Sequence, residues 1–117
     1  MDDFQNPKTF KNAEAICTLL VRLLLLEPGT IQSHPDAGVG LISRYRYATE
    51  DAIPELRSEF QSQIDRYLPQ FQGIRISVTK KKDRILIAAE IDSILYGISF
   101  DQSTSEINTD YKSLSDL

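Results

Sequence analysis

The sequence predicts an α+β fold, in which two amphipathic helices pack on one face of a three-stranded antiparallel β-meander and a polar C-terminal tail follows. Two observations lead to this prediction. Apolar residues recur at intervals of three and four in the first part of the chain, and at every second position between residues 74 and 100. Helical patterns followed by strand patterns are typical of a two-layer arrangement, and 117 residues make one domain of ordinary size.

The first helix is expected from about Phe10 to Leu26, after a polar N-terminal lead-in at residues 1–9. A spacing of three and four residues gives this helix a wide apolar face. That face consists of Phe10, Ala13, Ile16, Leu19, Leu20, Leu23, Leu24 and Leu26. Asn12 can cap the first turn through its side-chain oxygen. Pro28 ends the helix, because a proline pushes the residue before it, Glu27, out of the helical region.

The second helix carries apolar residues at the same spacing. They are Ile53, Leu56, Phe60, Ile64, Tyr67 and Phe71. Thr49 or Asp51 can cap its start, and Pro54 then falls in the first turn, where its missing N–H would have had no partner. Pro69 ends this helix at about Leu68.

Three strands are expected at about residues 74–79, 85–91 and 94–100, where apolar and polar residues alternate. The turns "KKKD" and "DS" separate them, and turns this tight favour an antiparallel meander. Residues 10–101 therefore form a single α+β domain. The polar stretch 102–117 is expected to be a tail that is mobile on its own or becomes ordered on a partner.

Composition excludes several classes of function. A net charge of −4 with no broad basic face argues against nucleic acid as a partner. The single Cys17 excludes an internal disulfide, and no histidine or cysteine cluster offers a metal site. The longest apolar run is far shorter than the roughly 18 residues of a membrane span, and the start "MDDFQNPK" is unlike a signal peptide. We expect no cofactor, no membrane partner and a reducing, cytoplasm-like compartment.

The loop "EPGTIQSHPDAGVG", residues 27–40, is either an active site or a rigid surface that a partner binds. A hydrolase would need a second carboxylate about 5 to 10 Å from Glu27, and Asp36 is the nearest candidate. We instead expect Glu27 to anchor the loop by accepting hydrogen bonds from the backbone or an arginine. His34, which Pro35 holds extended, is expected to serve in hydrogen bonding or packing. We therefore predict no catalytic residue.

The strand "ILYGISF", residues 94–100, is apolar on both faces, and as the last of three strands it would form a sheet edge. Exposed apolar edges favour pairing with other chains unless something covers them. Either a helix or the C-terminal tail covers this strand, or another chain adds a strand to it.

The order of these motifs resembles a known family. An apolar helix ends in "LLLLEPGT", a loop reaches "HPDAGVGL", "ISRY" follows, and the helix ending "DRYLPQF" leads into "IRISV", "ILIAAEI" and "ILYGISF". Over about Phe10 to Asp101 the chain resembles the baseplate wedge or sheath-initiator family of contractile phage tails and related contractile injection systems, some members of which are labelled lysozyme-like.

This resemblance implies a structural protein without enzymatic activity, present in six copies per virion tail baseplate, which is assembled in the host cytoplasm. Its implied partners are the tail sheath protein, other wedge proteins and the tube or hub proteins, and the first sheath ring adds extended arms to its sheet. The implied wedge-binding residues are Glu27, Pro28, Gly29, His34, Pro35 and Gly38. The implied sheath-binding edge consists of Ile94, Leu95, Tyr96, Gly97, Ile98, Ser99 and Phe100.

One position departs from the family. Its members often carry an arginine directly after the Glu-Pro pair, whereas this chain has Gly29, and the nearest basic residue further along is Arg44. Two alternative functions remain open, a peptidoglycan-cleaving enzyme and a small bacterial adaptor protein.

Overall fold

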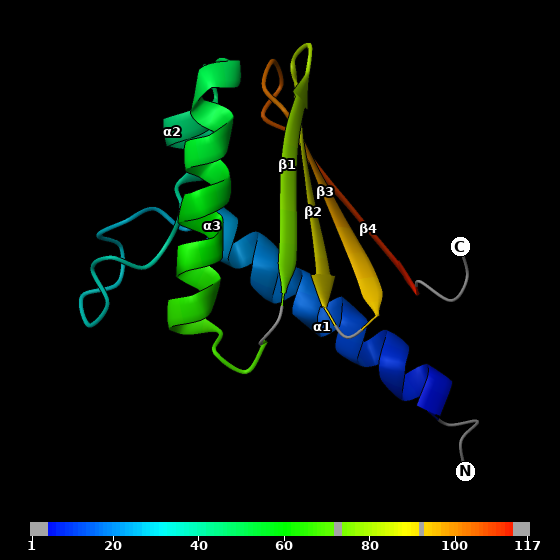
Figure 1. Ribbon diagram of the computed structural model, residues 1–117. Helices are drawn as coiled ribbons and strands as arrows, with labels where there is room; N and C mark the ends of the chain where they lie inside the picture. The colour runs from blue at the N-terminus through cyan, green and yellow to red at the C-terminus, as the bar shows by residue number, and fades with distance from the viewer. Residues whose placement is uncertain (1–4, 72–73, 92, 114–117) are drawn as a thin grey trace.

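The computed structural model describes residues 5–71, 74–91 and 93–113. The helices are α1 (Gln5–Leu25), α2 (Leu41–Tyr45) and α3 (Ile53–Tyr67), with the short 3-10 helix η2 (Glu50–Ala52) before α3. The strands are β1 (Arg75–Lys81), β2 (Arg84–Ile91), β3 (Ile94–Asp101) and β4 (Ile107–Ser113). Figure 1 shows their arrangement.

The α+β class holds, but the predicted three-stranded meander with two helices is wrong. The sheet has four antiparallel strands in the order β1-β2-β3-β4, and a third α-helix, α2, lies between α1 and α3. β4 lies within the stretch that we expected to be a polar tail. Its apolar residues Ile107 and Tyr111 are four positions apart, which is compatible with one face of a helix and equally with one face of a strand.

The helices cover one face of the sheet and leave the other open. α3 runs beside β1, and α1 passes behind the strands in Figure 1, where it contacts β3 and β4. Burial alternates along the first three strands, so that every second residue faces the core. Tyr96, Phe60 and Phe100 are the largest fully buried side chains in this core. Cys17 is also buried there, as a small core residue, and burial raises the pKa of its thiol.

Two predicted helix starts are wrong, whereas the predicted ends are nearly correct. α1 begins at Gln5, so Asn12 lies inside the helix and is not a cap. Ala52, not Thr49 or Asp51, is the N-cap of α3, and it makes no side-chain hydrogen bond there. Pro54 does lie in the first turn of α3, as expected.

Gln102 fastens two distant parts of the fold. Its side-chain Nε2 donates hydrogen bonds to the carbonyls of Tyr45, Arg46 and Ala48, at 3.0, 3.1 and 3.0 Å. Its backbone N–H donates to the carbonyl of Asp83, at 2.7 Å. The β3–β4 turn therefore satisfies carbonyls at and after the C-terminal end of α2, where helical carbonyls have no partner within the helix.

Candidate functional site

The loop at residues 26–40 returns to the helix from which it leaves. The N–H groups of Val39 and Gly40 donate to the carbonyls of Leu23 and Leu26, at 3.0 and 2.9 Å. These carbonyls lie at and just after the C-terminal end of α1, where the helix itself provides no donors. The loop therefore caps α1, and both of its ends are fixed.

Gln63 fixes the same loop from the side of α3. Its Oε1 accepts a hydrogen bond from the N–H of Gly38 at 2.8 Å, and its Nε2 donates to the carbonyl of Asp36 at 2.9 Å. The Gln63 side chain is buried, so these hydrogen bonds offset the cost of removing a polar amide from water. An exposed contact between Arg66 and Asp36, at 3.5 Å, lies beside them.

Gly38 lies at the inside of the loop, where a side chain would not fit. Its φ is +110°, and a Cβ atom there would lie 2.2 Å from the carbonyl oxygen of Leu26. Gly38 is buried. It therefore sets the path of the loop, and the other five predicted wedge-binding residues form the exposed part.

Those five residues, Glu27, Pro28, Gly29, His34 and Pro35, are all exposed. The N–H of Gly29 donates to the carbonyl of Pro35 at 2.8 Å and closes the loop. The His34 ring lies edge-on to that of Tyr67, with 5.6 Å between ring centroids. Oε1 of Glu27 accepts a 2.6 Å hydrogen bond from the Ser43 hydroxyl, and not from the backbone or arginine donor that we expected.

A polar network of α2 and α3 side chains also holds the loop in place. Arg44 pairs with Glu59 and donates to the carbonyl of Val39 at 3.2 Å. The Tyr45 hydroxyl donates to Oε1 of Glu59 at 2.7 Å. Burial, and then this hydrogen bond, raises the pKa of Tyr45 above its ordinary value. Arg44, the nearest basic residue after the Glu-Pro pair, therefore holds the loop through Glu59 and the Val39 carbonyl.

β3 is not a sheet edge, so the edge position predicted for residues 94–100 is wrong. β4 pairs along this whole stretch, from Ile94 opposite Ser113 to Phe100 opposite Ile107. The alternative that we left open, coverage of this strand by the C-terminal stretch, is the arrangement observed. The two edges of the sheet are β1 and β4.

The β1 edge is partly covered. Nε of Arg57, on α3, donates to the carbonyl of Ile76 at 3.1 Å, and α3 lies along this strand. Backbone groups alternate in direction along an antiparallel ladder. The N–H and C=O groups that point away from β2 are therefore those of Ile76, Val78 and Lys80. Arg57 therefore occupies an acceptor that an added strand would need.

The β4 edge is open. The N–H of Asp101 donates to the carbonyl of Glu106 at 2.9 Å, which marks the rung nearest the β3–β4 turn. Alternation from this rung directs the backbone groups of Ile107, Thr109 and Tyr111 away from β3. Within residues 5–71, 74–91 and 93–113, no strand pairs with this outer side.

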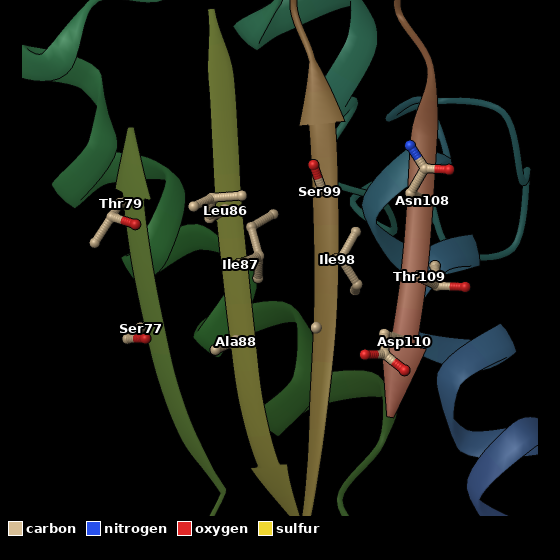
Figure 2. A pocket seen from close by; sticks show the side chains of 11 residues that line it. Ser77, Thr79, Leu86, Ile87, Ala88, Ile98, Ser99, Asn108, Thr109 and Asp110 are labelled. Carbon is tan, nitrogen blue, oxygen red and sulfur yellow. The ribbon is translucent and has the colours of Figure 1, made fainter. Parts of the chain in front are cut away.

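A shallow hollow lies on the open face of the sheet and is lined by residues of all four strands (Figure 2). By strand register its surface residues form two rows across the four strands. They are Ser77, Ala88, Gly97 and Asp110 in one row, and Thr79, Leu86, Ser99 and Asn108 in the other. Asp110 is the single charged residue among those that line the hollow. Glycoside hydrolysis by a carboxylate pair would need a second one facing it.

No group of three His, Cys, Asp or Glu side chains that could hold a metal ion occurs among the described residues. None of the helices in that part of the chain is long and apolar enough to cross a membrane.

Sequence reasoning missed three residues that determine these surfaces, Gln63, Gln102 and Arg57. Gln63 carried a signal, because it lies seven positions after Leu56, on the apolar stripe of α3. A polar residue on such a stripe indicates a buried hydrogen-bonding role. Gln102 and Arg57 lie in polar surroundings in the sequence, and nothing in their spacing marks them.

Comparison with known proteins gives a distant likeness to a solved structure. No family model matches the chain, and no curated protein matches it. The crystal structure of a "putative tail lysozyme" from Geobacter sulfurreducens is similar to it over 86% of each chain, with 19% sequence identity and a TM-score of 0.49.

Proposed function

We propose that this protein is a structural component of the baseplate of a contractile virion tail, assembled in the host cytoplasm. In this role it joins wedge, tube and hub proteins to the first sheath ring and templates sheath polymerisation by β-strand addition, in six copies per baseplate. The observation that carries the proposal is the open edge of β4 in a sheet whose other edge is partly covered.

The β4 edge is chemically suited to accept a strand. Ile107, Thr109 and Tyr111 direct their backbone N–H and C=O groups outward, and each hydrogen bond gained there contributes about 1 kcal/mol net. Proteins usually protect sheet edges with lysine, proline or a covering element. β1 carries Lys80 and Lys81 and is partly covered by Arg57, whereas β4 carries a single lysine, Lys112, and no proline. This contrast favours β4 as the edge that accepts a partner.

The exposed loop provides a second, separate surface. Figure 1 shows the loop and β4 on opposite sides of the molecule, as a linker between two partners requires. Gln63 and the end of α1 hold the loop in one shape, so a partner need not order it on binding. We assign the wedge contact to its exposed residues Glu27, Pro28, Gly29, His34 and Pro35.

We also propose that the protein has no catalytic turnover. The hollow on the open face of the sheet is lined by one carboxylate, and Glu27 accepts a hydrogen bond from Ser43. A cell-wall turbidity assay tests this, with Glu27→Gln as the control. Clearing by the intact protein, lost in Glu27→Gln, would favour the peptidoglycan-cleaving alternative. If the protein were instead a small bacterial adaptor, it would not bind sheath protein.

The strand-addition proposal is tested by two matched proline substitutions and co-purification with the sheath protein of the same genome. Thr109→Pro removes an outward N–H from β4 and Lys80→Pro removes one from β1, so both leave the pairing to β3 and β2 in place. We expect Thr109→Pro to stay folded and lose sheath binding, while Lys80→Pro binds as the intact chain does. Loss in Lys80→Pro alone would move the contact to β1. Failure of the intact chain to bind sheath would contradict the proposed role.

A further inference from the structure

The face of α1 that points away from the core has an unusual composition. Ala13, Cys17, Leu20 and Leu24 of this helix are buried. On the opposite face, five exposed residues line a shallow hollow along the helix. They are Glu14, Ala15, Thr18, Leu19 and Arg22. Positions 15, 18 and 22 follow the three-and-four spacing at which one helix packs against another in a coiled coil.

The small side chains on this face allow another helix to approach closely. Ala15 and Thr18 lie at its centre, and the Thr18 hydroxyl already donates to the carbonyl of Glu14 at 3.0 Å. Leu19 is 36% exposed, which is high for a leucine on a helix of a folded protein. This face thus combines low polarity at its centre with charges at its ends.

Those charges are placed symmetrically. Glu14 and Arg22 lie four residues on either side of Thr18 and have opposite signs. Neither forms a salt bridge with a residue whose side chain the structure describes, that is, within 13–71, 74–91 and 93–112. Along the helix axis they are about 12 Å apart, at 1.5 Å per residue. A two-fold axis through Thr18 would therefore place each charge opposite its counterpart.

We propose that α1 binds α1 of a second copy of this chain, antiparallel, across a two-fold axis near Thr18. Glu14 of each copy then faces Arg22 of the other, and the small Ala15 leaves room for that arginine. The surface is self-complementary, as a closed symmetric dimer requires. A helix of a different protein could bind this face with its own charges at any spacing, so it would not need Glu14 and Arg22 to be symmetric about Thr18. Pairing with a second copy does need that symmetry.

The same pairing covers an apolar groove that continues from this face. The groove is lined by Leu19, Arg22, Leu23, Leu25, Leu26, Ile31 and Leu68. In the antiparallel arrangement, the first turns of α1 of the second copy lie toward this groove. Apolar surface that is exposed in one copy is thereby removed from water in the dimer. The inference does not depend on the proposed role in a tail.

Charge reversal tests this arrangement in the full-length protein. Glu14→Arg and Arg22→Glu each replace two attractive contacts of the dimer by two repulsive ones. Sedimentation velocity over a range of concentrations should show a reversible dimer for the intact chain, and a dissociation constant at least about tenfold higher for either variant. Both side chains are exposed, so circular dichroism should show unchanged folding.

Mixing the two variants provides the matched control. At positions 14 and 22, the Glu14→Arg variant carries two positive charges and the Arg22→Glu variant carries two negative ones. Both contacts between unlike variants are therefore attractive, and an equimolar mixture should form a heterodimer although each variant alone is monomeric. A mixture that stays monomeric would overturn the proposal. So would an intact chain that is monomeric at every concentration, or single variants that dimerise as the intact chain does.

Discussion

The loop at residues 26–40 and the strand β4 both present surfaces for partners, but they are held in place differently. Side chains from other elements support the loop, with Gln63 bonded to its backbone on one side and Arg44 on another. β4 is held by a regular ladder to β3, in which the backbone provides the hydrogen bonds. The shape of the loop therefore depends on a few individual residues, whereas the path of β4 depends on pairing that most sequences can form.

The largest effect that follows from this contrast is expected at Gly38. Gly38→Ala places a Cβ atom 2.2 Å from the Leu26 carbonyl oxygen and forces a positive φ on a residue that disfavours it. We expect the free energy of unfolding to fall by about 3 kcal/mol, measured by urea denaturation.

Gly29→Ala is the control for that experiment. Gly29 also has a positive φ, +90°, but a Cβ atom there meets nothing within 4 Å. In this variant the free energy of unfolding should fall by only about 1 kcal/mol, which is the cost of a positive φ at a non-glycine residue. Equal losses in both variants would show that the close approach to Leu26 contributes nothing.

A smaller loss is expected at Gln63. Gln63→Ala leaves the N–H of Gly38 and the carbonyl of Asp36 without these partners, which should lower the free energy of unfolding by about 2 kcal/mol. Gln61→Ala serves as the control, because the Gln61 amide bonds only to the exposed Asp65. If Gln63→Ala matched that control, the loop would not depend on the Gln63 side chain.

The smallest effect concerns pH. The pKa of Tyr45 is raised in the folded protein, so its neutral form is favoured there. Its contribution to stability is complete below the ordinary pKa of 10.0 and is lost as pH rises above it, because the unfolded chain then ionises first. We expect the unfolding free energy of Tyr45→Phe to fall less steeply above pH 10 than that of the intact chain. Parallel curves would contradict this role of Tyr45.

The sequence predicted the parts of the fold that depend on periodicity. The ends of α1 and α3, and strands β1 to β3, follow from regular spacing of apolar residues and from proline. β4 could not be predicted in this way, since its open face carries Asn108, Asp110 and Lys112 and its inner face carries few apolar residues. Missing this one strand also misplaced the sheet edge, because each strand's position depends on its neighbours.

The location of the candidate loop could be predicted from the sequence, but the residues that hold it in place could not. Proline and glycine at residues 28–40 indicated a rigid loop directly. Several partners of that loop are far away in the sequence, as with Ser43, 16 positions after Glu27, and Gln63, 27 positions after Asp36. Such pairings depend on how α1 and α3 pack, which local spacing does not specify.

The hydrogen bonds of Gln102 also limit when α2 can gain its full support during synthesis. α2 has five residues, which is too short for a helix to be stable alone. The side chain that satisfies its last carbonyls comes from a residue 57 positions later than Tyr45. During synthesis α2 therefore lacks this support until Gln102 has left the ribosome. Until then, the segment between the loop and α3 has the carbonyls of Arg46 and Ala48 available to water or to a chaperone, whereas the Tyr45 carbonyl can accept the N–H of Ala48.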